Sequence, residues 1–258
     1  MTQTRTLPSG LSCTLDDSAD VARNPLAGVA IAIDGVYASG KGTLAITLAR
    51  LYRMKYLDTG TLYRAVAWKV MDGGHTPSDR TAAAEAARGL NFDFRHVGNN
   101  KFAVMVDGKD VTEAIRTPEV AQQSSVVAAQ TEVRAALLDF QKSYAAKWQP
   151  LVGVVMDGRD VGARIIPEAQ VKLFLTGDVE IRARRRWLDY VALGKEKPLE
   201  AVVQELLARD LRDEVNTIQT PDALVVNTSR LDALEVLAAA EELIQAKLGG
   251  VPRAAVGG

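Results

Sequence analysis

A glycine-rich segment directly after a short apolar run carries the clearest chemical signal in this sequence. Residues 29–34 are apolar up to Asp34, as in a buried parallel strand. The following residues fit G-x-x-x-x-G-K, with Gly42 where serine or threonine usually stands. In such a loop, successive backbone N–H groups surround a phosphate and the lysine adds a positive charge. The predicted phosphate loop comprises Gly35, Val36, Tyr37, Ala38, Ser39, Gly40, Lys41, Gly42 and Thr43.

The same residues also fit a dinucleotide-binding pattern. Residues 40–45 match G-x-G-x-x-A, and Asp58 lies near the spacing at which such folds keep a ribose-binding acid. A dinucleotide turn begins directly at the strand end, whereas five residues separate Asp34 from Gly40. The longer loop can enclose a phosphate, so the sequence favours a nucleoside triphosphate over NAD. A plain strand-to-helix turn with an exposed lysine is the structural alternative.

Two further polar groups follow predicted strands. Residues 58–60 precede Tyr63 and Arg64, and a helix start beside an arginine can bind a second anion. An N-cap with a surface arginine would explain the same residues. The apolar run at 154–156 ends in Asp157, and such an acid beside a phosphate loop is a usual place for magnesium coordination through water.

Composition narrows the class of protein. The chain has 258 residues and a net charge of −1, with 47% hydrophobic and 24% charged residues, as in an ordinary folded globular protein. The near-neutral charge argues against a duplex-DNA binder. Cys13 is the only cysteine and there are two histidines, so a disulfide framework or a zinc hydrolase is not expected. We find no apolar run long enough for a membrane span and no secretory signal, and expect a cytoplasmic protein.

The spacing of apolar runs predicts the architecture. Buried-type strands at 29–34, 55–57, 152–156, 171–175 and 224–226 alternate with helical patterns, which predicts an α/β fold with a parallel sheet. The stretch from 90 to 111 differs, because two alternating runs flank the turn signal at 98–100. We therefore expect a small antiparallel insert within about 72–118, helices at 118–129 and 132–147, and flexible tails at 1–27 and 249–258.

Together these segments resemble the bacterial-type cytidylate (CMP) kinases, within the P-loop nucleoside monophosphate kinases. The matching segments are residues 33–35 (IDG), 38–43 (ASGKGT), 57–60 (LDTG), 62–65 (LYRA), 110–112 (DVT), 115–117 (IRT), 157–160 (DGRD), 171–175 (VKLFL) and 209–213 (RDLRD). The likeness covers about residues 28–245. It implies a P-loop three-layer fold at 28–248, with the antiparallel insert as a monophosphate-binding subdomain and a helical lid at about 178–216.

The resemblance also implies roles for individual residues. A monomer would transfer phosphate from ATP, with Mg²⁺, to CMP or dCMP, without nucleic acid or membrane partners. Catalysis would fall to Lys41, Asp157, Arg159, Arg182 and Arg186, and metal binding to Thr43 and Asp157. Binding of CMP would fall to Thr59, Tyr63, Arg64, Ser125, Arg134, Arg159, Asp160, Arg209 and Asp213, among which Arg134, Ser125 and Asp160 face the base.

Structural alternatives exist for several of these residues. Ser125 sits in a predicted helix, where a serine is commonplace, and Arg134 fits an ordinary solvated helix position. Arg182, Arg184, Arg185 and Arg186 form the densest basic run. On a helix they point to more than one face, so a lid, a solvated helix or an RNA-binding patch would each account for them, in that order of preference.

Two differences from the family pattern stand out, one in the phosphate loop and one after residue 213. Val36 and Tyr37 stand where the family has small residues or proline, so the tyrosine must point outward or crowd the loop and weaken ATP binding. Asn216 stands where the family has a further arginine. The stretch from there to Pro221 is a few residues shorter than in the family. Loss of that cation would remove ~2–4 kcal/mol of transition-state stabilisation, or about 10²–10³ in rate. The alternatives are therefore a nucleotide-binding protein with weakened transfer, or a kinase with another monophosphate preference.

Overall fold

The computed structural model describes residues 4–6, 12–14, 24–96, 102–192 and 194–250. The chain divides into two compact units. The first, called the insert unit here, contains Met1–Ala22 and Leu57–Lys147; the second, called the core unit, contains Arg23–Tyr56 and Trp148–Gly258. The predicted turn at 98–100 and most of the predicted C-terminal tail lie outside the described residues.

The predicted parallel sheet is confirmed. Within the described residues a five-stranded sheet has the order β10-β9-β3-β8-β4. Its strands are β3 (Ala30–Gly35), β4 (Lys55–Asp58), β8 (Val154–Asp157), β9 (Val171–Thr176) and β10 (Leu224–Asn227). In the parallel register, Ile33 of β3 lies beside both Asp157 of β8 and Leu173 of β9. The carboxyl ends of β3, β8 and β9 therefore share one edge of the sheet, where the loops that follow them can form a site.

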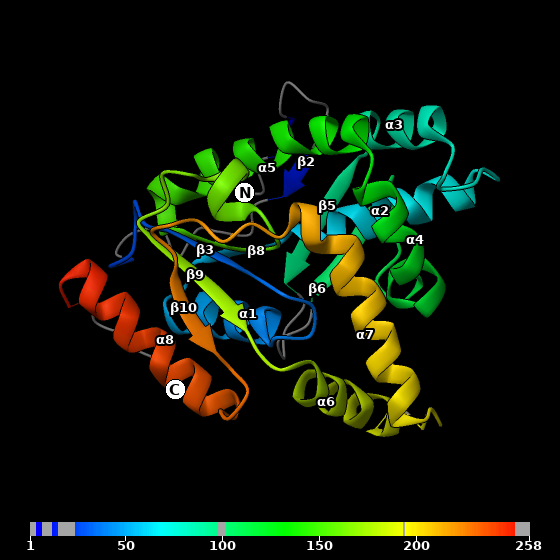
Figure 1. Ribbon diagram of the computed structural model, residues 1–258. Helices are drawn as coiled ribbons and strands as arrows, with labels where there is room; N and C mark the ends of the chain where they lie inside the picture. Colours follow the sequence, from blue (N-terminus) through cyan, green and yellow to red (C-terminus); the bar gives the residue numbers. More distant parts are fainter. Residues whose placement is uncertain (1–3, 7–11, 15–23, 97–101, 193, 251–258) are drawn as a thin grey trace. The chain divides into compact units, whose positions relative to one another are not determined.

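Helices follow the strands of the core unit. They are α1 (Lys41–Leu51), α6 (Val179–Ala192), α7 (Leu199–Asp213) and α8 (Ala233–Leu248), with a single π-helical turn at Val161–Ile165 and a 3-10 turn at Glu214–Asn216. Helix α1 buries Leu44 and Leu48, as its spacing of apolar residues predicts. Helices α6 and α7 pack together through Ala183, Val202 and Leu206, and Figure 1 shows the pair beyond the end of β9.

The insert unit holds the predicted antiparallel sheet. Strands β5 (Phe92–His96), β6 (Phe102–Val106) and β7 (Lys109–Asp110) pair in that order. The unit also contains α2 (Thr59–Asp72), α3 (Arg80–Arg88), a 3-10 turn at Ala114–Arg116, α4 (Pro118–Ala128) and most of α5 (Thr131–Val152). Phe92 meets Phe140 of α5 edge to face, with ring centroids 5.9 Å apart, which ties the sheet to this helix.

Three details differ from the sequence-based expectations. Helix α3 was not predicted, because its buried side chains are only alanines and leave a weak apolar pattern. Helix α5 continues to Val152, where a strand was expected; Gly153, at φ 76°, ends it and β8 starts at Val154. Inside the expected N-terminal tail, β1 (Thr4–Thr6) and β2 (Ser12–Thr14) pair antiparallel, as threonine-rich segments favour.

No helix in the described part of the chain has both the length and the apolar character that crossing a bilayer requires.

Candidate active site

The loop after β3 has the backbone of a phosphate-binding turn. Gly35 adopts φ 147°, and a Cβ there would lie 2.1 Å from the carbonyl oxygen of Leu175, so this approach of two strands requires glycine. Gly40, at φ 89°, precedes α1, and no side chain caps the first N–H groups of that helix. Uncapped N–H groups at a helix start are a favourable place for an anion.

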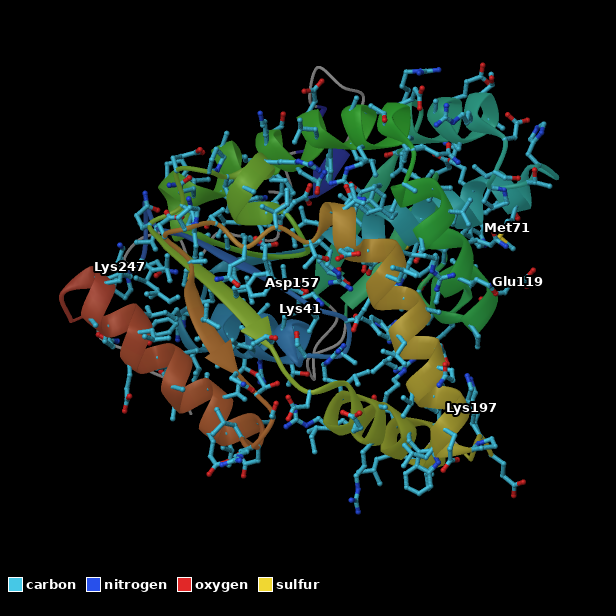
Figure 2. All side chains as sticks on the ribbon, viewed as in Figure 1. Lys41, Met71, Glu119, Asp157, Lys197 and Lys247 are labelled. Atoms are coloured by element: carbon cyan, nitrogen blue, oxygen red, sulfur yellow. The ribbon has the colours of Figure 1, made fainter. Side chains whose placement is uncertain are left out.

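Lys41 is the first residue of α1 and Asp157 the last residue of β8, and both are labelled in Figure 2. The ammonium group of Lys41 is 3.3 Å from the carbonyl oxygen of Val36, so this side chain curls back over the loop. Asp157 is 4% exposed and accepts a hydrogen bond of 2.7 Å from the hydroxyl of Tyr56. A Cβ on Gly42 would lie 3.8 Å from Asp157 Oδ2, so the carboxylate faces the first turn of α1.

Asp157 and Thr43 offer oxygen donors of the kind that Mg²⁺ binds. Mg²⁺ keeps several waters and binds through one or two carboxylates together with substrate phosphates. Asp157 supplies one such carboxylate, and Thr43 is exposed in the first turn of α1. In the described residues no group of three or more His, Cys, Asp or Glu side chains could hold a metal. The residues present therefore fit a magnesium ion that arrives with a nucleotide.

Asp34, at the end of β3, fixes the segment after Asp157. Its carboxylate accepts hydrogen bonds of 2.8 Å from the backbone N–H groups of Val161 and Gly162. Burial raises the pKa of Asp34 to about 6. The two backbone hydrogen bonds and the charge of Lys41 act in the opposite direction, and the charge of Asp160 adds to the increase.

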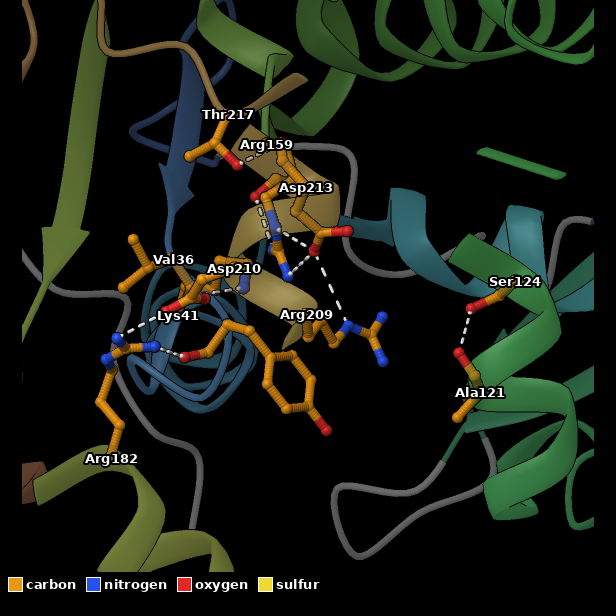
Figure 3. A network of polar contacts seen from close by, with 12 residues as sticks. Val36, Lys41, Ala121, Ser124, Arg159, Arg182, Arg209, Asp210, Asp213 and Thr217 are labelled. Atoms are coloured by element: carbon orange, nitrogen blue, oxygen red, sulfur yellow. Dashed lines mark hydrogen bonds and ion pairs between the residues drawn. The ribbon is translucent and has the colours of Figure 1, made fainter. Parts of the chain in front are cut away.

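Three of the predicted monophosphate ligands lie together in the core unit (Figure 3). Arg159 donates to Asp213 Oδ2, with its Nε at 3.2 Å and Nη2 at 3.1 Å. Arg209, one turn earlier on α7, has its Nε 3.7 Å from the same oxygen. The structure thus brings together two cations and one acceptor that come from the end of β8 and from α7.

Of the two placements that the sequence allows for Tyr37, the structure has the outward one. The tyrosine ring packs against the α6–α7 core formed by Ala183, Tyr190, Val202 and Leu206. Its face carries the guanidinium of Arg209, whose central carbon is 4.2 Å from the ring centroid. The ring therefore does not fill the phosphate loop.

The arginines of α6 point in different directions, as expected from their spacing. Arg182 is 5% exposed and donates to the carbonyl oxygens of Tyr37 and Gly177 and to Asp210 Oδ2. Arg185 donates to the carbonyl oxygens of Thr228 and Leu231. Arg186 lies over the ring of Tyr190 at 4.8 Å. Arg182 and Arg185 thus connect α6 to the phosphate loop, to α7 and to the segment after β10.

One cation beside Asp160 was missed by sequence reasoning. Arg164 Nη1 is 3.2 Å from Asp160 Oδ2 and 3.3 Å from Asn216 Oδ1. The position that departs from the family pattern, Asn216, therefore has a guanidinium beside it. The signal that could have found it is the i,i+4 spacing from Asp160 to Arg164.

The insert unit holds the remaining predicted ligands. Asp58 caps α2 by accepting from the N–H and hydroxyl groups of Thr61, so the N-cap interpretation of this acid is correct. Thr59 is buried in the first turn of α2. Tyr63 and Arg134 come together, with the guanidinium 5.7 Å from the ring centroid.

Ser125 and Arg64 have polar groups available for a ligand. The Ser125 hydroxyl is buried and has no hydrogen-bond partner in the described residues. Its neighbour Ser124 instead donates to the carbonyl oxygen of Ala121 at 2.8 Å, as serines in helices commonly do. Arg64 is half-buried and forms no ion pair with any residue that the structure describes. A buried hydroxyl without a partner in the described residues requires an explanation, which a polar ligand would supply.

Comparison with known proteins identifies the family. A family model described as cytidylate kinase matches residues 31–246. The chain belongs to the cytidylate kinase family. The cytidylate kinase of Acidiphilium cryptum is 43% identical over 220 residues, which cover 84% of this chain and 95% of that protein. The cytidylate kinase of Xanthobacter autotrophicus is also 43% identical, over 85% of this chain and 99% of that protein.

Solved structures show more distant similarity. A crystal structure from Thermus thermophilus is 21% identical and covers 86% of this chain and 98% of that one, with a TM-score of 0.43. A gluconokinase from Sinorhizobium meliloti is 15% identical over 88% and 96% of the two chains, with a TM-score of 0.42. These scores are low, so the fold assignment depends on the sheet described above. Membership of the family makes the chain an ATP-dependent kinase of nucleoside monophosphates.

Proposed function

We propose that this member of the family transfers the γ-phosphoryl group of MgATP to CMP and dCMP, giving ADP with CDP or dCDP. The observation that carries the proposal most directly is in the core unit. A buried carboxylate, Asp157, faces the start of α1 beside the phosphate loop, and the same unit holds the Arg159–Asp213–Arg209 cluster. A phosphoryl transfer requires charged groups on its donor and acceptor sides, and we assign these two sets of residues to those roles.

On the donor side, backbone N–H groups of residues 35–43 would bind the β-phosphate. The ammonium group of Lys41 would stabilise the negative charge that develops on the β–γ bridging oxygen. Asp157, through water, and Thr43 would hold Mg²⁺, which neutralises phosphate charge when it is bound. Positioning and charge neutralisation then provide most of the catalysis, and no strong general base is needed.

On the acceptor side, Arg64, Arg159 and Arg209 are proposed to bind the monophosphate and Asp213 the sugar hydroxyl. Cytosine offers acceptors at N3 and O2 and a donor at its amino group. A site for it therefore needs a cationic donor, for which we propose Arg134, and oxygen acceptors, for which we propose Ser125 and Asp160. Uracil reverses the pattern at N3 and C4 and would leave these groups unpaired, at ~1–3 kcal/mol for each buried group.

The arginines of α6 are proposed to complete the site. Arg182 and Arg186 lie on a helix that joins the phosphate loop through Arg182. Movement of this helix would bring positive charge to the phosphoryl group during transfer. It would also exclude water, which would otherwise hydrolyse ATP. Because all the proposed ligands come from one chain, we expect a monomer to be active.

The proposed function is tested by a panel of nucleoside monophosphates. Each of CMP, dCMP, UMP, AMP and GMP is supplied with MgATP, and release of ADP is followed in a coupled assay. A blank without monophosphate measures ATP hydrolysis. We expect fast ADP release with CMP and dCMP only. A preference for another monophosphate would overturn the assignment.

The second candidate function is a nucleotide-binding protein with weakened transfer, and Asn216 favours it. Its amide cannot supply the charge of an arginine, which lowers the expected rate. The guanidinium of Arg164 lies beside Asn216 and supplies a positive charge where the family has an arginine at position 216. This contact favours the kinase. Calorimetry that detects ATP binding without CDP formation from any monophosphate would select the second candidate.

A further inference from the structure

We propose that Tyr37 is a positioning residue that holds the guanidinium of Arg209 in place and thereby links the phosphate loop to the acceptor-side cations. The inference rests on the proposed function, in which Arg209 binds the monophosphate. It concerns a residue that departs from the family pattern, and it assigns that residue a role other than contact with ATP.

The contacts form a continuous series in the core unit. The Arg209 guanidinium lies over the Tyr37 ring at 4.2 Å. Arg209 Nε is 3.7 Å from Asp213 Oδ2, and the same oxygen accepts from Arg159 at 3.1 Å. The series thus runs from Tyr37 in the phosphate loop to Arg209, from Arg209 to the carboxylate of Asp213, and from there to Arg159.

The other end of the series is fixed by the backbone of the loop. The carbonyl oxygen of Tyr37 accepts a hydrogen bond of 2.7 Å from Arg182. Arg182 also pairs with Asp210 at 2.7 Å, and Asp210 is adjacent to Arg209 on α7. Tyr37 is therefore linked to two consecutive residues of α7. Its ring contacts Arg209, and its carbonyl oxygen is connected to Asp210 through Arg182.

The contact is compatible with binding of a phosphate by the guanidinium. A guanidinium that presents its flat face to an aromatic ring keeps its N–H donors in its own plane, directed away from the ring at its edge. Holding this long side chain in one rotamer removes part of the entropy that a ligand would otherwise cost on binding.

The test compares Tyr37→Leu with Tyr37→Phe. Leucine keeps the apolar packing on α6 and α7 and the backbone bond to Arg182, but it removes the aromatic face. We expect Tyr37→Leu to raise KM for CMP by about 3- to 30-fold, the range of a cation–π contact. KM for ATP and the melting temperature should stay close to those of the unaltered chain. Tyr37→Phe keeps the ring and should restore KM for CMP.

A double-mutant cycle identifies the partner. In the background of Arg209→Ala, Tyr37→Leu should add no further increase in KM, because the group that the ring holds is gone. An equal increase in both backgrounds would contradict the proposal. So would a parallel rise in KM for ATP with a lower melting temperature, which is the signature of a purely structural role.

Direct binding separates this inference from the proposed function. Calorimetric titration of CMP in the presence of a non-hydrolysable ATP analogue measures the dissociation constant without turnover. If the unaltered chain makes CDP but Tyr37→Leu binds CMP with the same dissociation constant, the role of Tyr37 is overturned and the proposed function is not. Absence of CMP binding to the unaltered chain overturns both. Weaker binding by Tyr37→Leu supports the inference whether or not turnover is fast.

Discussion

Lys41 is the residue whose loss should separate folding from chemistry most clearly. It lies in the first turn of α1, is 9% exposed, and reaches back to the carbonyl oxygen of Val36. Replacement by alanine removes the mobile charge of the phosphate loop, and we expect kcat/KM to fall by roughly 10²–10³. Circular dichroism and thermal melting should show a folded protein.

Lys172 provides the matched control for Lys41. Its side chain is similarly buried, at 10% exposure, and belongs to the same unit, but it pairs with Asp222 at 2.9 Å. The variant Lys172→Ala should therefore keep its turnover. Equal loss of activity in both variants, or an active Lys41→Ala, would count against the phosphate-loop assignment.

Ser125 should influence specificity rather than stability. Its hydroxyl is buried without a partner in the described residues, so Ser125→Ala should leave the melting temperature unchanged or slightly higher. KM for CMP should rise roughly 3- to 10-fold, since one hydrogen bond to the base is lost. Ser124→Ala, which removes a bond within α4, should change neither KM nor base preference. An unchanged KM in Ser125→Ala would exclude this serine from the base site.

At the level of elements, the strands were the easiest part to predict. Runs of valine, isoleucine and leucine indicate β3, β8 and β9. A strand that is buried on both faces is apolar at nearly every position, so its sequence is a nearly continuous apolar run. Helix α3 was missed, since Ala83, Ala84 and Ala87 bury little area each. Its one clear signal was Asp79, which caps the helix by accepting from Thr81 and Ala82.

The site was predictable only where neighbours in sequence act together. The place of the glycine loop between β3 and α1, and of Asp157 at the end of β8, could be predicted because both follow from local spacing. The stacking of Arg209 on Tyr37 and the approach of Arg164 to Asn216 depend on packing between distant segments, which spacing does not encode. The roles proposed for Ser125, Arg134 and Asp160 stay predictions.

The connection between β3 and the π-helical turn should make stability depend on pH. The pKa of Asp34 is raised to about 6, so between about pH 4 and 6 the folded chain binds a proton at this group that the unfolded chain has lost. The contribution of this acid is therefore fully present below about pH 4 and is lost as pH rises through about 6. The shift corresponds to about 3 kcal/mol.

Asp34→Asn isolates this contribution. The amide can accept from only one of the two N–H groups of Val161 and Gly162, so the variant should be less stable. Its deficit relative to the unaltered chain should shrink as pH rises from 4 to 7, because only aspartate acquires a disfavoured charge. Denaturant unfolding at several pH values measures it. A deficit independent of pH would contradict the raised pKa.

For the whole molecule, the net charge of −1 conceals the arrangement on which function depends. Arg159, Arg164 and Arg209 each lie beside a carboxylate, Asp213 or Asp160, so the charges of these three cations are balanced within the fold. A phosphate that binds must therefore share or replace these carboxylate partners. This balance explains how a nearly neutral chain can serve two anionic nucleotides.

The destination of the γ-phosphoryl group tests the central claim most directly. The chain is incubated with Mg²⁺, ATP labelled at the γ-phosphate and CMP, and the products are separated and counted. We predict that the label appears in CDP, and that Lys41→Ala reduces this transfer by roughly 10²–10³. Label that stays in ATP while calorimetry shows ATP bound, or that appears as inorganic phosphate, would contradict the account.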